Sequence, residues 1–98
     1  IGSGQGILVV DGDYSTVVNT AIWLGKQNFK AFCCTAAKTA LEILSCSSHP
    51  IELLLVNHNL PDMTGEELAK QAARMKPNIK VICFDAENIS QTVTKLLE

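Results

Sequence analysis

The sequence lacks a strong net charge, long apolar runs and paired metal-ligand motifs. Its formal net charge is −2, which leaves no electrostatic footprint for DNA, RNA or an anionic membrane. No apolar run approaches the roughly 20 residues of a transmembrane helix, and the N-terminus IGSGQG does not resemble a signal peptide. We therefore expect neither a nucleic acid nor a membrane as a direct partner.

The cysteines also lack the spacing of a metal site. None of them forms a C-x-x-C pair, and the two histidines are not spaced as co-ligands, so zinc is not expected. Cys33 and Cys34 are neighbours in an expected strand and should point to opposite faces, which disfavours a disulfide between them. Free cysteines in apolar segments fit a reducing compartment, so we expect a cytoplasmic protein.

The composition that is present indicates one globular domain. The chain has 98 residues, of which 47% are hydrophobic and 18% charged, enough for a single modest core. The glycine-rich residues 1–6 are interpreted as a flexible leader or a tag remnant. Residues 7–98 then form the domain.

Four short apolar runs predict strands, and the first of them is continuously apolar and β-branched, as in a strand buried on both faces. They cover residues 7–10, 30–34, 51–57 and 79–84. Between and after them, amphipathic patterns predict helices over 15–29, 36–45, 63–75 and 88–98. The alternating order predicts an α/β domain with a parallel sheet and helices on both faces, a flavodoxin-like three-layer α/β/α fold.

The expected helices carry start signals and apolar stripes. In the first helix, Val18, Ile22 and Phe29 should face the core, with Ala21 and Leu24 filling the stripe. Ser15 or Asp13 should cap its start. Thr35 is expected to cap the second helix. Thr64 should cap the third, where a glutamate follows three residues later as in a capping box.

Functional sites in open parallel sheets form beyond the carboxyl ends of the strands. There the first strand delivers Asp11, Gly12 and Asp13. The third strand delivers Asn57, and the fourth delivers Asp85. The sequence therefore predicts an oxygen-rich, acidic pocket at this edge.

Three stretches of this pattern, ILVVDGD, LLLVNHNLPDMTG and VICFDA, resemble the receiver domain of two-component response regulators, the CheY-like fold. In that family an acidic pair after the first strand holds a divalent cation. An aspartate at the end of the third strand accepts a phosphoryl group from a histidine kinase, a Ser or Thr ends the fourth strand, and a Lys before Pro ends the fifth. The resemblance runs from about residue 7 to about residue 87.

The match to this family is incomplete at the pocket. Asp11 falls at the first acidic position, Gly12 at the second, and Asp13 at the acidic residue that often follows. Asn57 falls at the phosphoacceptor, and Asp85 at the Ser/Thr switch position. No Lys-Pro pair follows the fourth strand.

These departures remove what phosphoryl transfer requires, an anionic nucleophile and a metal that neutralises phosphate charge. The sequence therefore predicts a degenerate receiver, or pseudo-receiver, that is not an enzyme, binds no cofactor and binds Mg²⁺ poorly if at all. Its expected partners are proteins: a histidine kinase, a fused output domain, another receiver, or a second copy of itself.

The end of the sequence also departs from the family, which places a fourth helix, a fifth strand and a fifth helix after the fourth strand. Only one helix fits here. Either a segment that holds the fourth helix and fifth strand is missing from this chain, or the domain is a shortened variant. A shortened sheet would expose the flank of the fourth strand, a site for pairing.

Several alternatives stay open at this point. Asn57 could simply close a turn, and Asp11 and Asp13 could cap a helix or form a weak cation site. The domain could instead be a working phosphoacceptor with an altered acceptor residue. It could also be a small-ligand domain, for example for a flavin or nucleotide, because a fold alone does not fix function.

Overall fold

The computed structural model describes residues 4–46 and 50–84. Strands and helices alternate along this part of the chain. The elements are β1 (Gly6–Val10), α1 (Tyr14–Lys26), β2 (Lys30–Cys34), α2 (Ala37–Ser45), β3 (Ile51–Asn57), α3 (Gly65–Met75) and β4 (Lys80–Phe84). The expected strands are found with bounds that differ by at most one residue. Gly6 belongs to the sheet, one residue before the expected start of β1.

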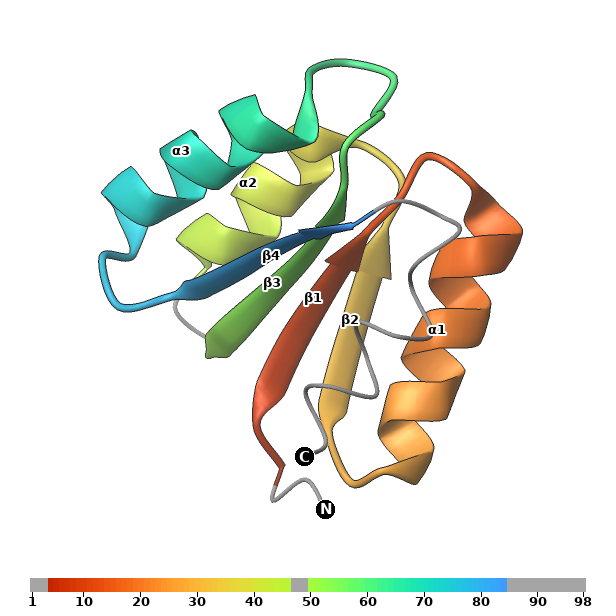
Figure 1. Cartoon of the computed structure of the whole chain (residues 1–98). Coiled ribbons are helices and arrows are strands. Elements are labelled where there is room, and N and C mark those ends of the chain that lie inside the picture. Colours follow the sequence, from red (N-terminus) through yellow and green to blue (C-terminus); the bar gives the residue numbers. More distant parts are fainter. Residues whose placement is uncertain (1–3, 47–49, 85–98) are drawn as a thin grey trace.

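The four strands form one parallel sheet in the order β2-β1-β3-β4 (Figure 1). β1 pairs with β2 and β3, and β3 pairs with β4, all in parallel. Parallel strands in this order need crossover connections, which the helices supply. The predicted flavodoxin-like α/β/α architecture is confirmed.

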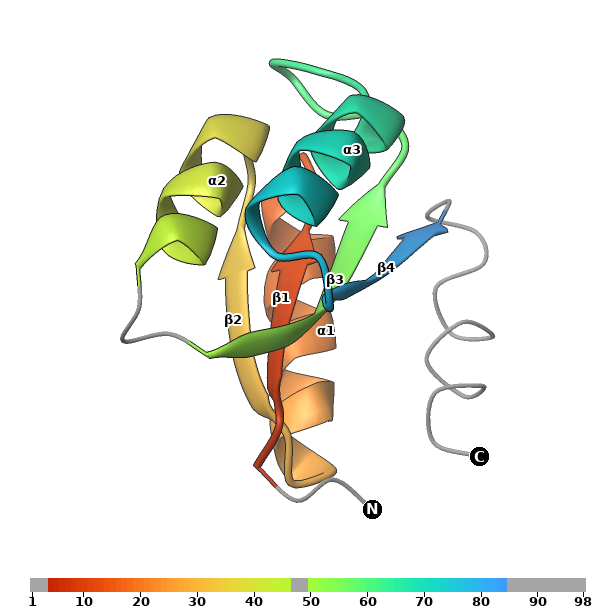
Figure 2. The ribbon, with the colours of Figure 1, turned by 90° about the vertical axis from the view of Figure 1, so that its left-hand side faces the viewer.

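The helices cover the two faces of the sheet unequally. α2 and α3 lie side by side on one face and α1 lies on the other, as Figures 1 and 2 show from two directions. Because side chains alternate along a strand, Leu8 and Val10 of β1 pack towards α2 and α3. Ile7 and Val9 pack with residues of α1. The central strands are thus buried on both faces, which explains their continuous apolar runs.

The apolar stripe of α1 matches the expected one at Val18 and Leu24, which pack in the core, and differs at Ile22 and Phe29. Val17 and Leu24 are its fully buried residues, whereas Ile22 is 54% exposed. The helix ends at Lys26, and Asn28 turns the chain with a φ of 69°. Phe29 therefore lies outside the helix, although it still packs against the core. The expected stripe was wrong at Ile22 because it was continued to Phe29, beyond the turn that ends the helix.

The expectations for the chain after β4 fall outside the described residues. They concern the helix over 88–98 and the segment between the fourth strand and that helix. Within the described part, β2 and β4 are the edge strands of the sheet. Their carboxyl ends, with those of β1 and β3, lie at the edge where the candidate site is built.

Candidate functional site

Two of the residues singled out in the sequence meet at the carboxyl edge of the sheet. Asp11 directly follows β1, and Asn57 is the last residue of β3, the neighbouring strand. The Asn57 side-chain Nδ2 donates a hydrogen bond to Oδ2 of Asp11 at 3.2 Å. Both residues are buried, with exposed fractions of 4% for Asp11 and 7% for Asn57. A buried carboxylate needs such a donor, because an unpaired one is costly.

The remaining oxygens of this pair are also engaged. Oδ1 of Asp11 accepts a hydrogen bond from the backbone N–H of Asp13 at 2.9 Å. Oδ1 of Asn57 accepts one from the backbone N–H of Asn59 at 2.8 Å. Each side chain therefore holds the loop that follows its own strand, and the bond between them joins the two loops.

Asp13 and Gly12 complete the loop after β1. Asp13 caps α1, since its Oδ1 accepts from the backbone N–H of Thr16 at 3.2 Å. The helix-cap interpretation thus describes Asp13, while Asp11 lies buried against Asn57. A Cβ on Gly12 would lie 3.5 Å from Cδ of Pro61, an ordinary contact distance. Space does not require a glycine there.

The fourth strand reaches the same edge of the sheet, but Asp85, the pocket residue expected after it, lies outside the described residues. β4 ends at Phe84, whose Cα pairs with that of Asn57. Asp85, at the switch position, is the next residue and lies outside the described residues. Its expected place in the acidic pocket therefore stays a prediction. What the structure places against Asn57 is Asp11.

The described side chains fit a divalent cation poorly. No group of three His, Cys, Asp or Glu residues suited to a metal ion occurs in the described part of the chain. Mg²⁺ prefers an octahedron of oxygen ligands. Asn57 turns its nitrogen towards Asp11, and its oxygen is occupied by the Asn59 N–H. Asp13 is occupied as a helix cap.

His58, the residue after Asn57, turns to α3. Its Nδ1 pairs with Oε1 of Glu66 in the first turn of that helix. The pKa of the Glu66 carboxyl is lowered, first by its own backbone N–H at the helix start and then by His58. The His58 backbone N–H donates to the carbonyl of Phe84 at 3.2 Å. The loop after β3 is thus tied to β4 and α3.

Asp62, in the same loop, is a residue that the sequence interpretation missed. Its Oδ1 accepts from the backbone N–H of Ala37, and its Oδ2 from that of Lys38, both at 2.9 Å. These bonds cap α2, so the expectation that Thr35 caps this helix was wrong. The cap position is Ala36, which has no side-chain hydrogen bond. The two N–H groups lower the pKa of Asp62, the Lys38 N–H most strongly.

Gly65, at the start of α3, sets how closely that helix approaches β3. A Cβ there would lie 2.5 Å from the backbone oxygen of Asn57. Real Cβ atoms do not approach a carbonyl oxygen so closely. Thr64, the residue before it, caps α3 by accepting from the Glu67 N–H at 3.1 Å, as expected. The start of α3 therefore needs glycine for packing against the end of β3.

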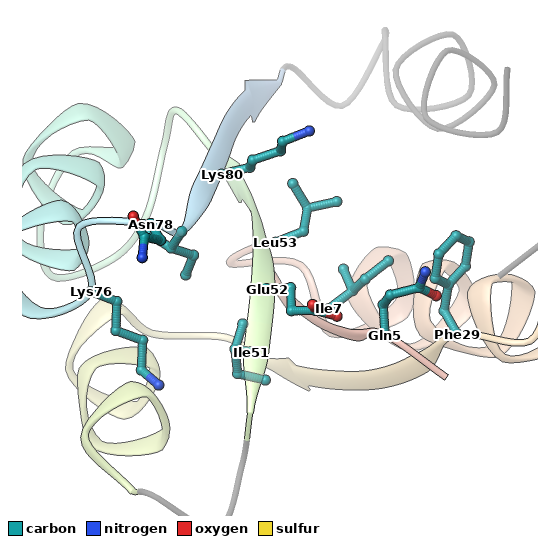
Figure 3. Close-up of a pocket in the computed structure, with 10 residues that line it drawn as sticks. Gln5, Ile7, Phe29, Ile51, Glu52, Leu53, Lys76, Asn78 and Lys80 are labelled. Atoms are coloured by element: carbon teal, nitrogen blue, oxygen red, sulfur yellow. The ribbon is translucent and has the colours of Figure 1, made fainter. Parts of the chain in front are cut away.

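A cleft of about 530 Å³ lies at the opposite edge of the sheet (Figure 3). It is lined by residues at or before the amino ends of the strands and thus lies away from Asp11 and Asn57. The lining residues are Gln5, Ile7, Phe29, Ile51, Glu52, Leu53, Lys76, Asn78, Ile79 and Lys80. The described helices include none that is long and apolar enough to cross a bilayer.

Comparisons with a family model and with individual proteins point to the same family. The family model described as "Response regulator receiver domain" matches residues 7–98. The two-component response regulator ORR5 of Oryza sativa subsp. japonica is 29% identical over 100 residues, which cover 99% of this chain and 72% of that protein. A probable histidine kinase 4 of the same subspecies is 30% identical over 92 residues, covering 94% of this chain and 9% of the kinase.

Solved structures agree with this comparison. The response regulator receiver domain protein of Methanospirillum hungatei JF-1 superposes with a TM-score of 0.77 and 26% identity, covering 94% of this chain and 75% of that one. A receiver domain of Clostridium thermocellum gives the same TM-score at 15% identity, covering 94% of this chain and 74% of that one. At that identity the likeness concerns the fold alone.

Proposed function

We propose that this chain, which belongs to the family of response regulator receiver domains, is a signalling module that accepts no phosphoryl group at its third strand. In this proposal it acts within two-component signalling by binding other proteins rather than as an enzyme. The family membership supports the pathway. The loss of phosphorylation rests on the side chains of the carboxyl edge.

The observation that carries the proposal is the hydrogen bond from Asn57 to Asp11. Acyl-phosphate formation needs a carboxylate oxygen that attacks phosphorus. Asn57 offers a neutral amide, whose oxygen already accepts from the Asn59 N–H. Its nitrogen donates to the carboxylate that would hold a cation. The amide thus satisfies the Asp11 carboxylate by hydrogen bonding within the fold, while the carboxylate keeps its negative charge.

The neighbouring positions support the same conclusion. Asp13 is committed to capping α1, and Gly12 brings no carboxylate. A phosphoryl dianion at this edge would face Asp11 without the positive charge that a metal or lysine supplies. In our proposal the edge is therefore held in one state, and the domain presents a constant surface.

The partner class follows from the relatives. One relative is a response regulator and another is a histidine kinase that contains a similar stretch. We infer a protein partner of this kind: a histidine kinase, an output domain or another receiver, including a second copy of the chain. A cytoplasmic location is part of the proposal, because Cys33, Cys34, Cys46 and Cys83 are free thiols.

The test is restoration of the missing groups, one at a time. Asn57→Asp is incubated with a small acyl-phosphate donor and Mg²⁺, and phosphate incorporation is measured by intact mass. We expect no stable phosphorylation from this single change, because the second acidic position is still Gly12. The double variant with Gly12→Asp, whose new Cβ would make only ordinary contacts, should bind Mg²⁺ more tightly than the single variant.

A matched control is Asn59→Asp, which makes the same chemical change at an exposed position two residues away. It should behave as the unchanged chain. Efficient phosphorylation of Asn57→Asp alone would favour the alternative, a working receiver in which only the acceptor residue has been altered. That result would overturn the claim that several positions are degenerate.

A further inference from the structure

Asp62 joins the loop after β3 to the amino end of α2 through two hydrogen bonds. We propose that Asp62 is a positioning residue: it latches the β3–α3 loop, residues 58–64, to the amino end of α2 and thereby holds the Asn57 amide against Asp11. The inference concerns the geometry of this chain, and it goes beyond the proposed lack of phosphorylation.

The first step is the capping of α2 from a distant part of the sequence. The first N–H groups of a helix have no partner within it. Ala36, at the cap position, has no side chain that could serve. Asp62 takes the N–H of Ala37 with one oxygen and that of Lys38 with the other. Figure 1 shows the β3–α3 loop and the amino end of α2 at the same end of the sheet.

The second step is the stiffness of the β3–α3 loop. Asn59 and Thr64 form an isolated antiparallel bridge across it. The Gly65 N–H donates to the carbonyl of His58 at 2.9 Å. A loop closed in this way moves as a unit, so a displacement at Asp62 reaches Asn59. The Asn59 N–H donates to Oδ1 of Asn57. Asn57 in turn donates to Asp11, so the chain of contacts from Asp62 ends at these two buried side chains.

The third step is the charge of the latch. The groups that act on the Asp62 carboxylate are the N–H donors of Lys38 and Ala37, its own backbone N–H, the Lys38 ammonium of α2 and the Cys34 thiol at the end of β2. The donors lower the pKa of Asp62. A lowered folded-state pKa means that the latch stabilises the fold above the ordinary carboxyl pKa. That contribution is lost as the pH falls through the lowered value.

The experiment is site-resolved amide exchange and NMR at pH 7 on Asp62→Ala and Asp62→Asn, without any phosphodonor. Glu42→Gln is the matched control, because Glu42 is an exposed carboxylate on the same helix α2. In Asp62→Ala, protection of the Ala37 and Lys38 amides should fall by roughly 5-fold, the usual contribution of a helix cap. The side-chain NH₂ resonances of Asn57 should shift as well.

Asp62→Asn should give an intermediate result, because a carboxamide has one accepting oxygen instead of two. Glu42→Gln should leave both signals unchanged. Unchanged protection of Ala37 and Lys38 in Asp62→Ala would refute the latch. If the Ala37 and Lys38 amides lose protection but the Asn57 side-chain resonances do not move, Asp62 is only a local helix cap, and its coupling to Asn57 is refuted. Neither result bears on phosphorylation, so the two proposals fail separately.

Discussion

Replacement of Asn57 by aspartate should destabilise the domain at neutral pH, although it restores the residue typical of the family position. The amide nitrogen of Asn57 lies 3.2 Å from a carboxylate oxygen of Asp11. The change exchanges that donor for a second anionic oxygen. Two carboxylates would then face each other at a site where both residues are buried.

The magnitude follows from charge and distance. If the side chains relax to about 4 Å, two unit charges at an effective dielectric of about 20 repel by about 4 kcal/mol. The variant also loses a hydrogen bond to a charged acceptor, which contributes about 1.5–3 kcal/mol. Proton sharing between the carboxylates and entry of water offset part of this. We expect the free energy of unfolding to fall by about 2–4 kcal/mol at pH 7.

The pH dependence has a definite sign. A crowded carboxylate pair binds one proton more readily in the folded state than in the unfolded state, and the shared proton restores a hydrogen bond. The deficit of Asn57→Asp should therefore be largest at neutral pH and shrink as the pH falls towards about 4. Mg²⁺ should also reduce it, because the cation offsets the repulsion.

The assay is urea denaturation at pH 7 and pH 5, with and without Mg²⁺. Asn59→Asp is the control: it adds the same charge at an exposed position in the same loop and should change stability by less than about 0.5 kcal/mol. If Asn57→Asp is as stable as the unchanged chain at pH 7, with no dependence on pH, the direct contact between these two side chains is not what holds the pocket.

Two other predictions test packing and burial. Gly65→Ala should cost about 1–3 kcal/mol, because the new Cβ would lie 2.5 Å from the Asn57 carbonyl oxygen. Gly25→Ala, in the last turn of α1 where a new Cβ would meet nothing within 4 Å, should instead stabilise the domain by up to about 0.5–1 kcal/mol. Equal effects of the two changes on the free energy of unfolding would contradict the close approach of Gly65 to β3. Burial raises the pKa of the Cys34 thiol to about 11, so peptide mapping after brief alkylation at pH 8 should show modified Cys33, which is exposed, and little modified Cys34. Faster labelling of Cys34 would show that this end of β2 opens.

The sheet could be predicted from the sequence because its signals are local. The run in β1 and residues 53–56 of β3 are continuously apolar and buried, because each central strand is covered on both faces, which gives a pattern without alternation. Turn and cap residues such as Thr64 act on neighbours three residues away. These features need no knowledge of the rest of the chain.

What could not be predicted depends on contacts between distant residues. Asp62 caps a helix that begins 25 residues earlier, and nothing in the α2 sequence shows that its cap lies elsewhere. The sequence placed Asn57 and Asp11 at one edge, but the direction of the amide depends on the N–H groups around it. The stripe of α1 was misjudged because Phe29 packs from beyond the helix end.

The account rests on the inability of the carboxyl edge to take up a phosphoryl group, and the intact mass of the unchanged protein tests this most directly. The chain is incubated with an acyl-phosphate donor and Mg²⁺, beside a working receiver as positive control. We predict that the control gains the mass of one phosphoryl group and that this chain gains none. A gain of that mass on the unchanged chain, removed by hydroxylamine as an acyl phosphate would be, would contradict the account.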